Sequence, residues 1–160
     1  MRDIWNVKSN ENRGVKLHFD PEVDQELKKE IQAFLRWIRK SYIFPTKLNI
    51  RISKEYRITT WTTNEKVCGT IFFPDAKNYN PIIRIATGDY HFLIAKYGKF
   101  SAGCMILDTI SHEITHYYQW LKDSSGSGDF NEGQAMYKSK QIVNKYLDSC
   151  FCENRLEPFS

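Results

Sequence analysis

The sequence has few of the residues and patterns that mark several large classes of protein. It contains eight glycines, five prolines, four cysteines and four histidines among 160 residues. Together with 41% hydrophobic and 26% charged residues, this composition excludes collagen-like, low-complexity and disordered chains. The uninterrupted apolar runs, such as residues 71–73 and 104–107, are short, and none approaches the ~20 apolar residues of a membrane-spanning helix. A chain of this length predicts a single globular domain over residues 1–160.

Charged residues and cysteines are spread along the chain without a recognisable pattern. The net charge is +4, from 23 basic and 19 acidic residues. Because the basic residues are scattered rather than massed, the sequence does not indicate nucleic-acid binding. Residues 1–10 lack the apolar segment of a secretory signal, and the four cysteines show no disulfide-framework spacing. We therefore expect free thiols and a cytoplasmic protein without membrane association.

Hydrophobic periodicity predicts an α+β fold whose first half holds one helix and a sheet. Residues 4–7 and 15–19 resemble the two strands of a hairpin. Asp20 and Pro21 predict the start of an amphipathic helix that ends near Pro45. β-Branched and aromatic residues then predict three or four strands of a mixed or antiparallel sheet. The four candidate segments are residues 48–52, 56–63, 67–73 and 82–86.

The second half of the chain is predicted to be helical. A short helix is expected over residues 90–97, followed by a longer helix with Ser101 as its N-cap. A loop at residues 123–129 separates that helix from a last one over residues 131–147.

The longer helix contains the sequence His112-Glu113-Ile114-Thr115-His116. Histidines four residues apart project from the same helix face and can bind one Zn²⁺, and the glutamate between them can act as a base. At 100° per residue, Gln119 lies on the histidine face, whereas Ile110 and Ile114 lie on the opposite, apolar face. The helix is therefore expected to bury one side and to turn its histidines toward a metal.

A catalytic zinc needs a third protein ligand and an open position for water. No histidine follows His116, so the third ligand must be a carboxylate or a thiolate. The downstream candidates are Asp123, Asp129, Glu132, Asp148, Cys150, Cys152, Glu153 and Glu157.

Glu132 is the candidate that the helical pattern favours. Projected on a helical wheel, Glu132 falls on the apolar side of the last helix with Ala135, Met136, Ser139 and Tyr146. An inward-pointing carboxylate is unfavourable unless it is paired or bound to a metal. Alternatively, Glu132 interacts with the helix dipole or caps its own helix.

The motif at residues 112–116, followed by Glu132 and Ala135 on a second helix, resembles the gluzincin clan of zinc metallopeptidases. The small size is similar to that of minigluzincins and of compact SprT-like and ImmA-like zincin domains. The resemblance covers residues 108–136 specifically and residues 20–147 loosely. It implies a zincin-like α+β domain, in which an N-terminal helix and a small sheet pack on an active-site helix and a following glutamate helix.

In gluzincins the two histidines and the downstream glutamate bind zinc, which implies one Zn²⁺ per chain held by His112, His116 and Glu132. The resemblance also makes Glu113 the general base. It would take a proton from a zinc-activated water and pass it to the leaving amine, so that a peptide bond is hydrolysed. The expected partner is a peptide or protein substrate.

Two further expectations come from the resemblance. Zincins bind an extended substrate beside an edge strand, and the strand at Ile82–Ala86 is the candidate because Pro81 at its start suits an edge. Gluzincins also use a downstream Tyr or His to stabilise the oxyanion. No histidine remains for that role, and spacing does not choose between Tyr137 and Tyr146.

Two alternative functions stay open on the sequence alone. The chain could be a peptide deformylase-like hydrolase, which would take its third ligand from an upstream cysteine, here Cys68. It could also be a non-catalytic, zincin-shaped binding module, although a site without catalysis has no need of the base Glu113.

Overall fold

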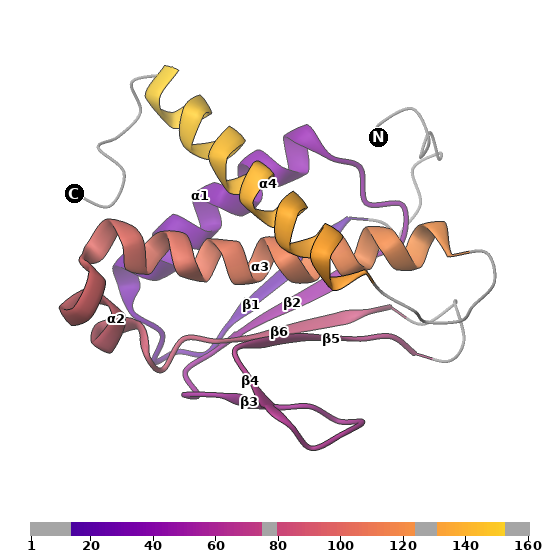
Figure 1. The fold of residues 1–160 in the computed structure, drawn as a ribbon, viewed down its shortest axis with the longest axis horizontal. Coiled ribbons are helices and arrows are strands. Elements are labelled where there is room, and N and C mark those ends of the chain that lie inside the picture. The colour runs from indigo at the N-terminus through magenta and orange to yellow at the C-terminus, as the bar shows by residue number, and fades with distance from the viewer. Residues whose placement is uncertain (1–13, 75–79, 124–130, 153–160) are drawn as a thin grey trace. The chain divides into compact units, whose positions relative to one another are not determined.

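A computed structural model describes residues 14–74, 80–123 and 131–152. These residues form four helices and six strands, with a small mixed sheet, which confirms the predicted α+β class (Figure 1). The contacts divide the chain into two compact units, Met1–Thr87 and Gly88–Ser160. The single domain over residues 1–160 stays a prediction.

The first unit contains a four-stranded mixed sheet with the order β1-β2-β6-β5. β1 (Val15–Phe19), β2 (Leu48–Ser53) and β6 (Ile82–Ala86) run parallel, and β5 (Gly69–Phe72) pairs antiparallel with β6. The short strands β3 (Ile58–Thr59) and β4 (Lys66–Val67) form a separate antiparallel pair. The first strand of the predicted N-terminal hairpin, residues 4–7, lies outside the described residues.

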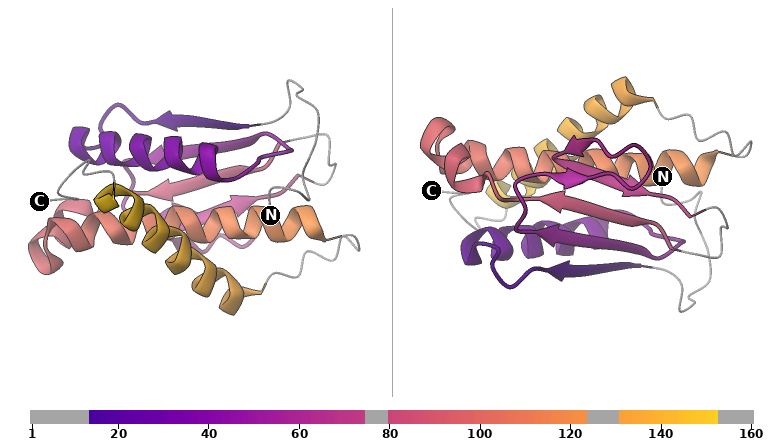
Figure 2. Two further views of the ribbon diagram at one scale, coloured as in Figure 1. Left: turned by 90° about the horizontal axis from the view of Figure 1, so that it is seen from above. Right: turned by 90° about the horizontal axis from the view of Figure 1, so that it is seen from below.

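Helix α1 (Gln25–Ser41) covers one face of this sheet, and the β3–β4 hairpin lies on the other face (Figures 1 and 2). The strands alternate accordingly: Ile50 and Ile83 are fully buried in register, whereas the next residue of β2, Arg51, is exposed. This period of two separates an apolar face from a polar one. The buried face of α1 completes the apolar layer with Leu27, Ile31, Phe34, Leu35 and Ile38.

The predicted start of α1 was wrong by four residues. The N-cap is Asp24, whose side chain accepts a hydrogen bond from the Leu27 amide at 3.0 Å. Asp20 belongs to a turn instead, and its Oδ2 accepts a hydrogen bond from the Lys54 amide at 2.9 Å. Both positions offer the carboxylate that an N-cap needs, so local sequence could not distinguish them.

The predicted edge strand was also wrong. Ile82–Ala86 pairs with β2 on one side and with β5 on the other, so β6 is internal, and β1 and β5 are the edges of the sheet. Pro81 precedes β6, where its missing N–H removes no hydrogen bond from the paired residues. A proline at the start of a strand is therefore compatible with an internal position.

The second unit contains α2 (Tyr90–Tyr97), α3 (Lys99–Lys122) and α4 (Glu132–Cys152). Gly98 joins α2 to α3 with a φ of +90°, a conformation that glycine adopts without strain. Its amide donates to the Ile94 carbonyl, and its carbonyl accepts from the Ala102 amide. Helix α3 therefore begins at Lys99, and Ser101 is not its N-cap as predicted. No helix in the described ranges is long and apolar enough to cross a bilayer.

Helix α4 follows α3 in the chain and packs against it. Its buried stripe follows the predicted period and comprises Ala135, Ser139, Ile142, Val143, Tyr146 and Cys150. Met136, which was predicted on this side, is 60% exposed. The described thiols of Cys68, Cys104 and Cys150 are free, as predicted; the side chain of Cys152 and most of the loop at residues 123–129 lie outside the described residues.

Candidate metal centre

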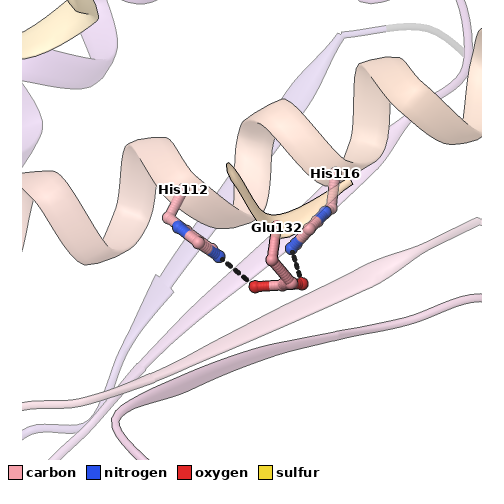
Figure 3. A group of neighbouring side chains, drawn as sticks. All are labelled: His112, His116 and Glu132. Atoms are coloured by element: carbon pink, nitrogen blue, oxygen red, sulfur yellow. Dashed lines mark hydrogen bonds and ion pairs between the residues drawn. The ribbon is translucent and has the colours of Figure 1, made fainter. Parts of the chain in front are cut away.

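Helix α3 positions both histidines of the motif on the same face. His112 and His116 are one turn apart, and their rings meet edge to face with centroids 4.8 Å apart (Figure 3). Ile110 and Ile114, on the opposite face, are buried. The side chain of His116 is only 6% exposed and that of His112 is 23% exposed, so the pair lies at the boundary between core and solvent.

The third side chain comes from the first residue of α4. Asn131 caps this helix, because its Oδ1 accepts a hydrogen bond from the Gln134 amide at 2.9 Å and its carbonyl accepts one from the Ala135 amide. The cap fixes the first turn of α4 and therefore the Cα of Glu132. The Glu132 side chain then extends between the two histidines of α3 (Figure 3).

The carboxylate of Glu132 divides its two oxygens between the imidazoles. Its Oε2 lies 3.1 Å from His112 Nε2, and its Oε1 lies 2.8 Å from His116 Nε2. One ligand atom from each residue lies within 4.8 Å of the others. Two imidazole nitrogens and one carboxylate oxygen, gathered this closely, are a donor set that Zn²⁺ accepts at three positions of a tetrahedron.

Gln119 orients the buried imidazole from the far side. Its Nε2 donates to the Asn131 carbonyl at 3.0 Å and to Gln134 Oε1 at 2.8 Å. Because a backbone carbonyl only accepts, this contact assigns the amide nitrogen, and Oε1 must face His116 Nδ1, 2.8 Å away. His116 therefore carries a hydrogen on Nδ1, and Nε2 is the ring atom that faces Glu132.

Glu113 is buried, with 8% of its surface exposed. Burial raises its pKa from an ordinary value of 4.5 to about 8, and the negative charge of Glu132 adds to the shift. The carboxyl group of Glu113 therefore lies within electrostatic reach of Glu132. Without a cation nearby, this group stays protonated at neutral pH.

The structure brings together the three predicted ligands, but the reason given for Glu132 was wrong. Its side chain is 71% exposed, so no penalty for a buried carboxylate selects it. The position on the first turn of α4 was the informative part of the prediction. Gln119 was recognised on the histidine face, yet its role was missed because two of its partners are Asn131, the cap of α4, and Gln134 of α4.

The other candidate ligands that the structure describes are not members of this group. Cys68, the alternative third ligand, is exposed and belongs to the first unit. Among the described residues Asp123, Asp148 and Cys150 are also outside the group. The remaining candidates, Asp129, Glu153, Glu157 and the Cys152 side chain, lie outside the described residues.

The two tyrosines considered for oxyanion stabilisation differ in their surroundings. Tyr137 is 63% exposed, and its hydroxyl accepts a hydrogen bond from Gln141 at 3.0 Å. Tyr146 is 2% exposed and belongs to the buried stripe of α4. The assignment of an oxyanion residue therefore stays open between them.

No protein-family model, curated protein or solved structure matches this chain.

Proposed function

We propose that this protein is a zinc-dependent metallopeptidase that binds Zn²⁺ through His112, His116 and Glu132 and uses Glu113 as its general base. The observation that carries the proposal is the convergence of three ligand atoms within 4.8 Å of one another at a His-Glu-x-x-His helix. The substrate class is a peptide or protein.

The donor chemistry of the site fits zinc. Imidazole nitrogen and carboxylate oxygen are both common zinc ligands, and three of them leave the fourth tetrahedral position for water or substrate. The hydrogen bond from His116 Nδ1 to Gln119 orients the ring so that Nε2 faces Glu132, which makes Nε2 the atom that would bind the metal. Glu132 is largely exposed, so solvent and substrate have access to the site from its side.

A zinc ion bound here would polarise a carbonyl and lower the pKa of water. Glu113 would then serve as the proton acceptor, because a divalent cation nearby favours the ionised form of its buried carboxyl group. Its position one residue after His112 places it on the same turn as the ligands. The same carboxylate would deliver the proton to the departing amine.

Metal analysis of purified variants tests the site. We expect about one Zn²⁺ per wild-type chain, and strong loss of zinc in both His116→Ala and Glu132→Ala. Cys68→Ser is the matched control and should keep the wild-type zinc content. Loss of zinc in Cys68→Ser with retention in Glu132→Ala would overturn the assignment of the third ligand in favour of the deformylase-like alternative.

Activity is tested by incubating the zinc-loaded protein with a mixed peptide library and detecting new N-termini by mass spectrometry. We expect wild-type protein to generate cleavage products that Glu132→Ala does not. Absence of products from a fully zinc-loaded wild type would contradict the enzymatic proposal and favour the non-catalytic binding module.

A further inference from the structure

A hollow of about 600 Å³ lies in the first unit, between the sheet and the β3–β4 hairpin. The right view of Figure 2 shows this hairpin in front of the sheet, on the face opposite α1. The lining comes from strands β1, β2 and β6 and from residues 55–66. These segments are far apart in the sequence, and the metal ligands are not among them.

The floor of the hollow is a row of basic side chains. Strand register aligns His18 of β1 with Arg51 of β2, and Arg51 with Arg84 of β6. Aligned residues of neighbouring strands point to the same face and are about 4.8 Å apart along the sheet. The sequence spreads its basic residues evenly, but the sheet brings these three into one line.

Positive charge prevails around this row. Four cationic side chains line the hollow, namely Arg51, Arg57, Lys66 and Arg84, against two carboxylates, Asp20 and Glu55. One carboxylate oxygen of Asp20 already accepts a hydrogen bond from the Lys54 amide.

Within the described residues, neither Asp20 nor Glu55 forms an ion pair with Arg51 or Arg84. Like charges directly opposite each other destabilise a sheet. The two arginines therefore lie side by side, and neither is paired with Asp20 or Glu55.

Arg84 is fixed by two contacts and still has hydrogen-bond donors that these contacts do not use. Its Nη2 donates to the Thr59 carbonyl at 3.0 Å, and its guanidinium lies over the Trp61 ring, 3.9 Å from the centroid. Its Nε is buried and has no hydrogen-bond partner among the described residues. Burial and, secondarily, the charge of Arg51 lower the pKa of Arg84.

We propose that this hollow binds the phosphate group of a small phosphorylated ligand, with Arg51 and Arg84 as its principal contacts. A guanidinium presents a planar fork of donors that matches phosphate oxygens. A phosphate dianion offsets two neighbouring arginines at one position, whereas a carboxylate offsets only one. Lys66 extends the positive surface beyond a single phosphate, so a diphosphate should bind more tightly than inorganic phosphate.

Amide NMR titration of the full-length protein with inorganic phosphate and then pyrophosphate tests this proposal. We expect saturable shifts confined to the segments around His18, Arg51 and Arg84, and tighter binding of pyrophosphate. Arg51→Gln should weaken pyrophosphate binding roughly tenfold, which corresponds to one charge-assisted hydrogen-bonding group. Arg51 is exposed, so this variant should fold.

Arg36→Gln is the matched control, since it removes the same charge from the exposed face of α1. It should change the affinity less than about twofold, because a distant exposed charge is screened by salt. Equal weakening by Arg36→Gln and Arg51→Gln would mean non-specific attraction to a basic protein and would overturn the proposal.

Two further binding measurements identify which kind of molecule carries the phosphate. Adenosine diphosphate should bind at least as well as pyrophosphate if the ligand is a small molecule. Preferential binding of a single-stranded oligonucleotide, or of a glutamate-rich peptide, would overturn the proposal in favour of a nucleic acid or an acidic protein segment. Arg84→Lys keeps the charge but removes the fork, and undiminished pyrophosphate binding by this variant would also contradict the assignment.

Discussion

The two units gather side chains of opposite chemical character. In the second unit, His112, His116 and Glu132 place three electron-pair donors together, which suits a cation. In the first unit, Arg51 and Arg84 place two cations side by side, which suits an anion. A ligand of the opposite sign would stabilise each one.

The comparison also separates two ways of building a site. The metal centre uses helix periodicity and a helix cap, so its residues have a short and regular spacing in the sequence. The basic hollow uses the register of parallel strands, so its residues are more than thirty positions apart. Substitutions should therefore affect the two sites independently, and the following predictions test that expectation.

The largest expected effect concerns Glu113. Glu113→Gln should lower peptide-bond cleavage by about 10²–10⁴-fold, the usual contribution of a general base, while the zinc content stays at the wild-type level. Parallel measurements of cleavage rate and bound metal test this. Loss of zinc together with activity would show that Glu113 supports the metal rather than the proton transfer.

The second effect concerns the stability of metal-free protein. The folded-state pKa of Glu113 is about 8, above the ordinary value of 4.5. Between these values the folded state holds a proton that the unfolded state releases, so the free energy of unfolding should fall as pH rises from about 4.5 to about 8. The limiting slope is about 1.4 kcal/mol per pH unit for this group.

Urea denaturation of metal-free wild type and Glu113→Gln across this pH range isolates the contribution of Glu113. The variant should lack the descending slope, since glutamine does not titrate. Identical pH profiles for the two proteins would contradict the raised pKa.

A third effect concerns Gln119, which contacts His116 and the start of α4. Gln119→Ala should weaken zinc binding by about 10–100-fold, the usual effect of losing a residue that orients a metal ligand. Competition with a chelator of known affinity measures the change. Gln141→Ala is the control, because it removes a glutamine hydrogen bond on α4 away from the metal ligands.

The smallest expected effect is a change in the free energy of unfolding caused by Arg51→Gln. Without a ligand, Arg51→Gln should increase the free energy of unfolding by about 0.2–1 kcal/mol, because it removes one of two like charges in register. Arg36→Gln should leave it nearly unchanged. With saturating pyrophosphate the order should reverse, and wild type should be the more stable protein. A loss of stability in ligand-free Arg51→Gln would mean that Arg51 already has a compensating partner.

Sequence reasoning succeeded where local periodicity determines position. The face shared by His112 and His116 follows from helical geometry, and so does the placement of Glu132 at the start of the last helix. It failed where the outcome depends on distant partners. Asp20 and Asp24 are equivalent as caps until Lys54 is seen to contact Asp20, and nothing near Ile82–Ala86 reveals that β5 covers its free side.

The basic hollow shows even more clearly that local sequence does not reveal contacts between distant residues. Arg51 and Arg84 each occur alone among apolar residues of a strand, which is the ordinary pattern of a half-exposed sheet. Their proximity depends on the parallel pairing of β2 with β6 and on its register. A shift of one residue in that register would place Arg84 opposite an isoleucine, so the charge cluster is a property of topology and not of composition.

Asn131 is a further position at which mutation could abolish the proposed metal binding. Its carbonyl holds Gln119 and its side chain starts the helix that carries Glu132, yet it belongs to no ligand motif. In evolutionary terms, a lineage could lose the proposed metal site through this residue while both histidines and both glutamates stay intact. Serine, threonine or aspartate at this position would keep an oxygen able to cap α4, and these replacements should therefore preserve the position of Glu132.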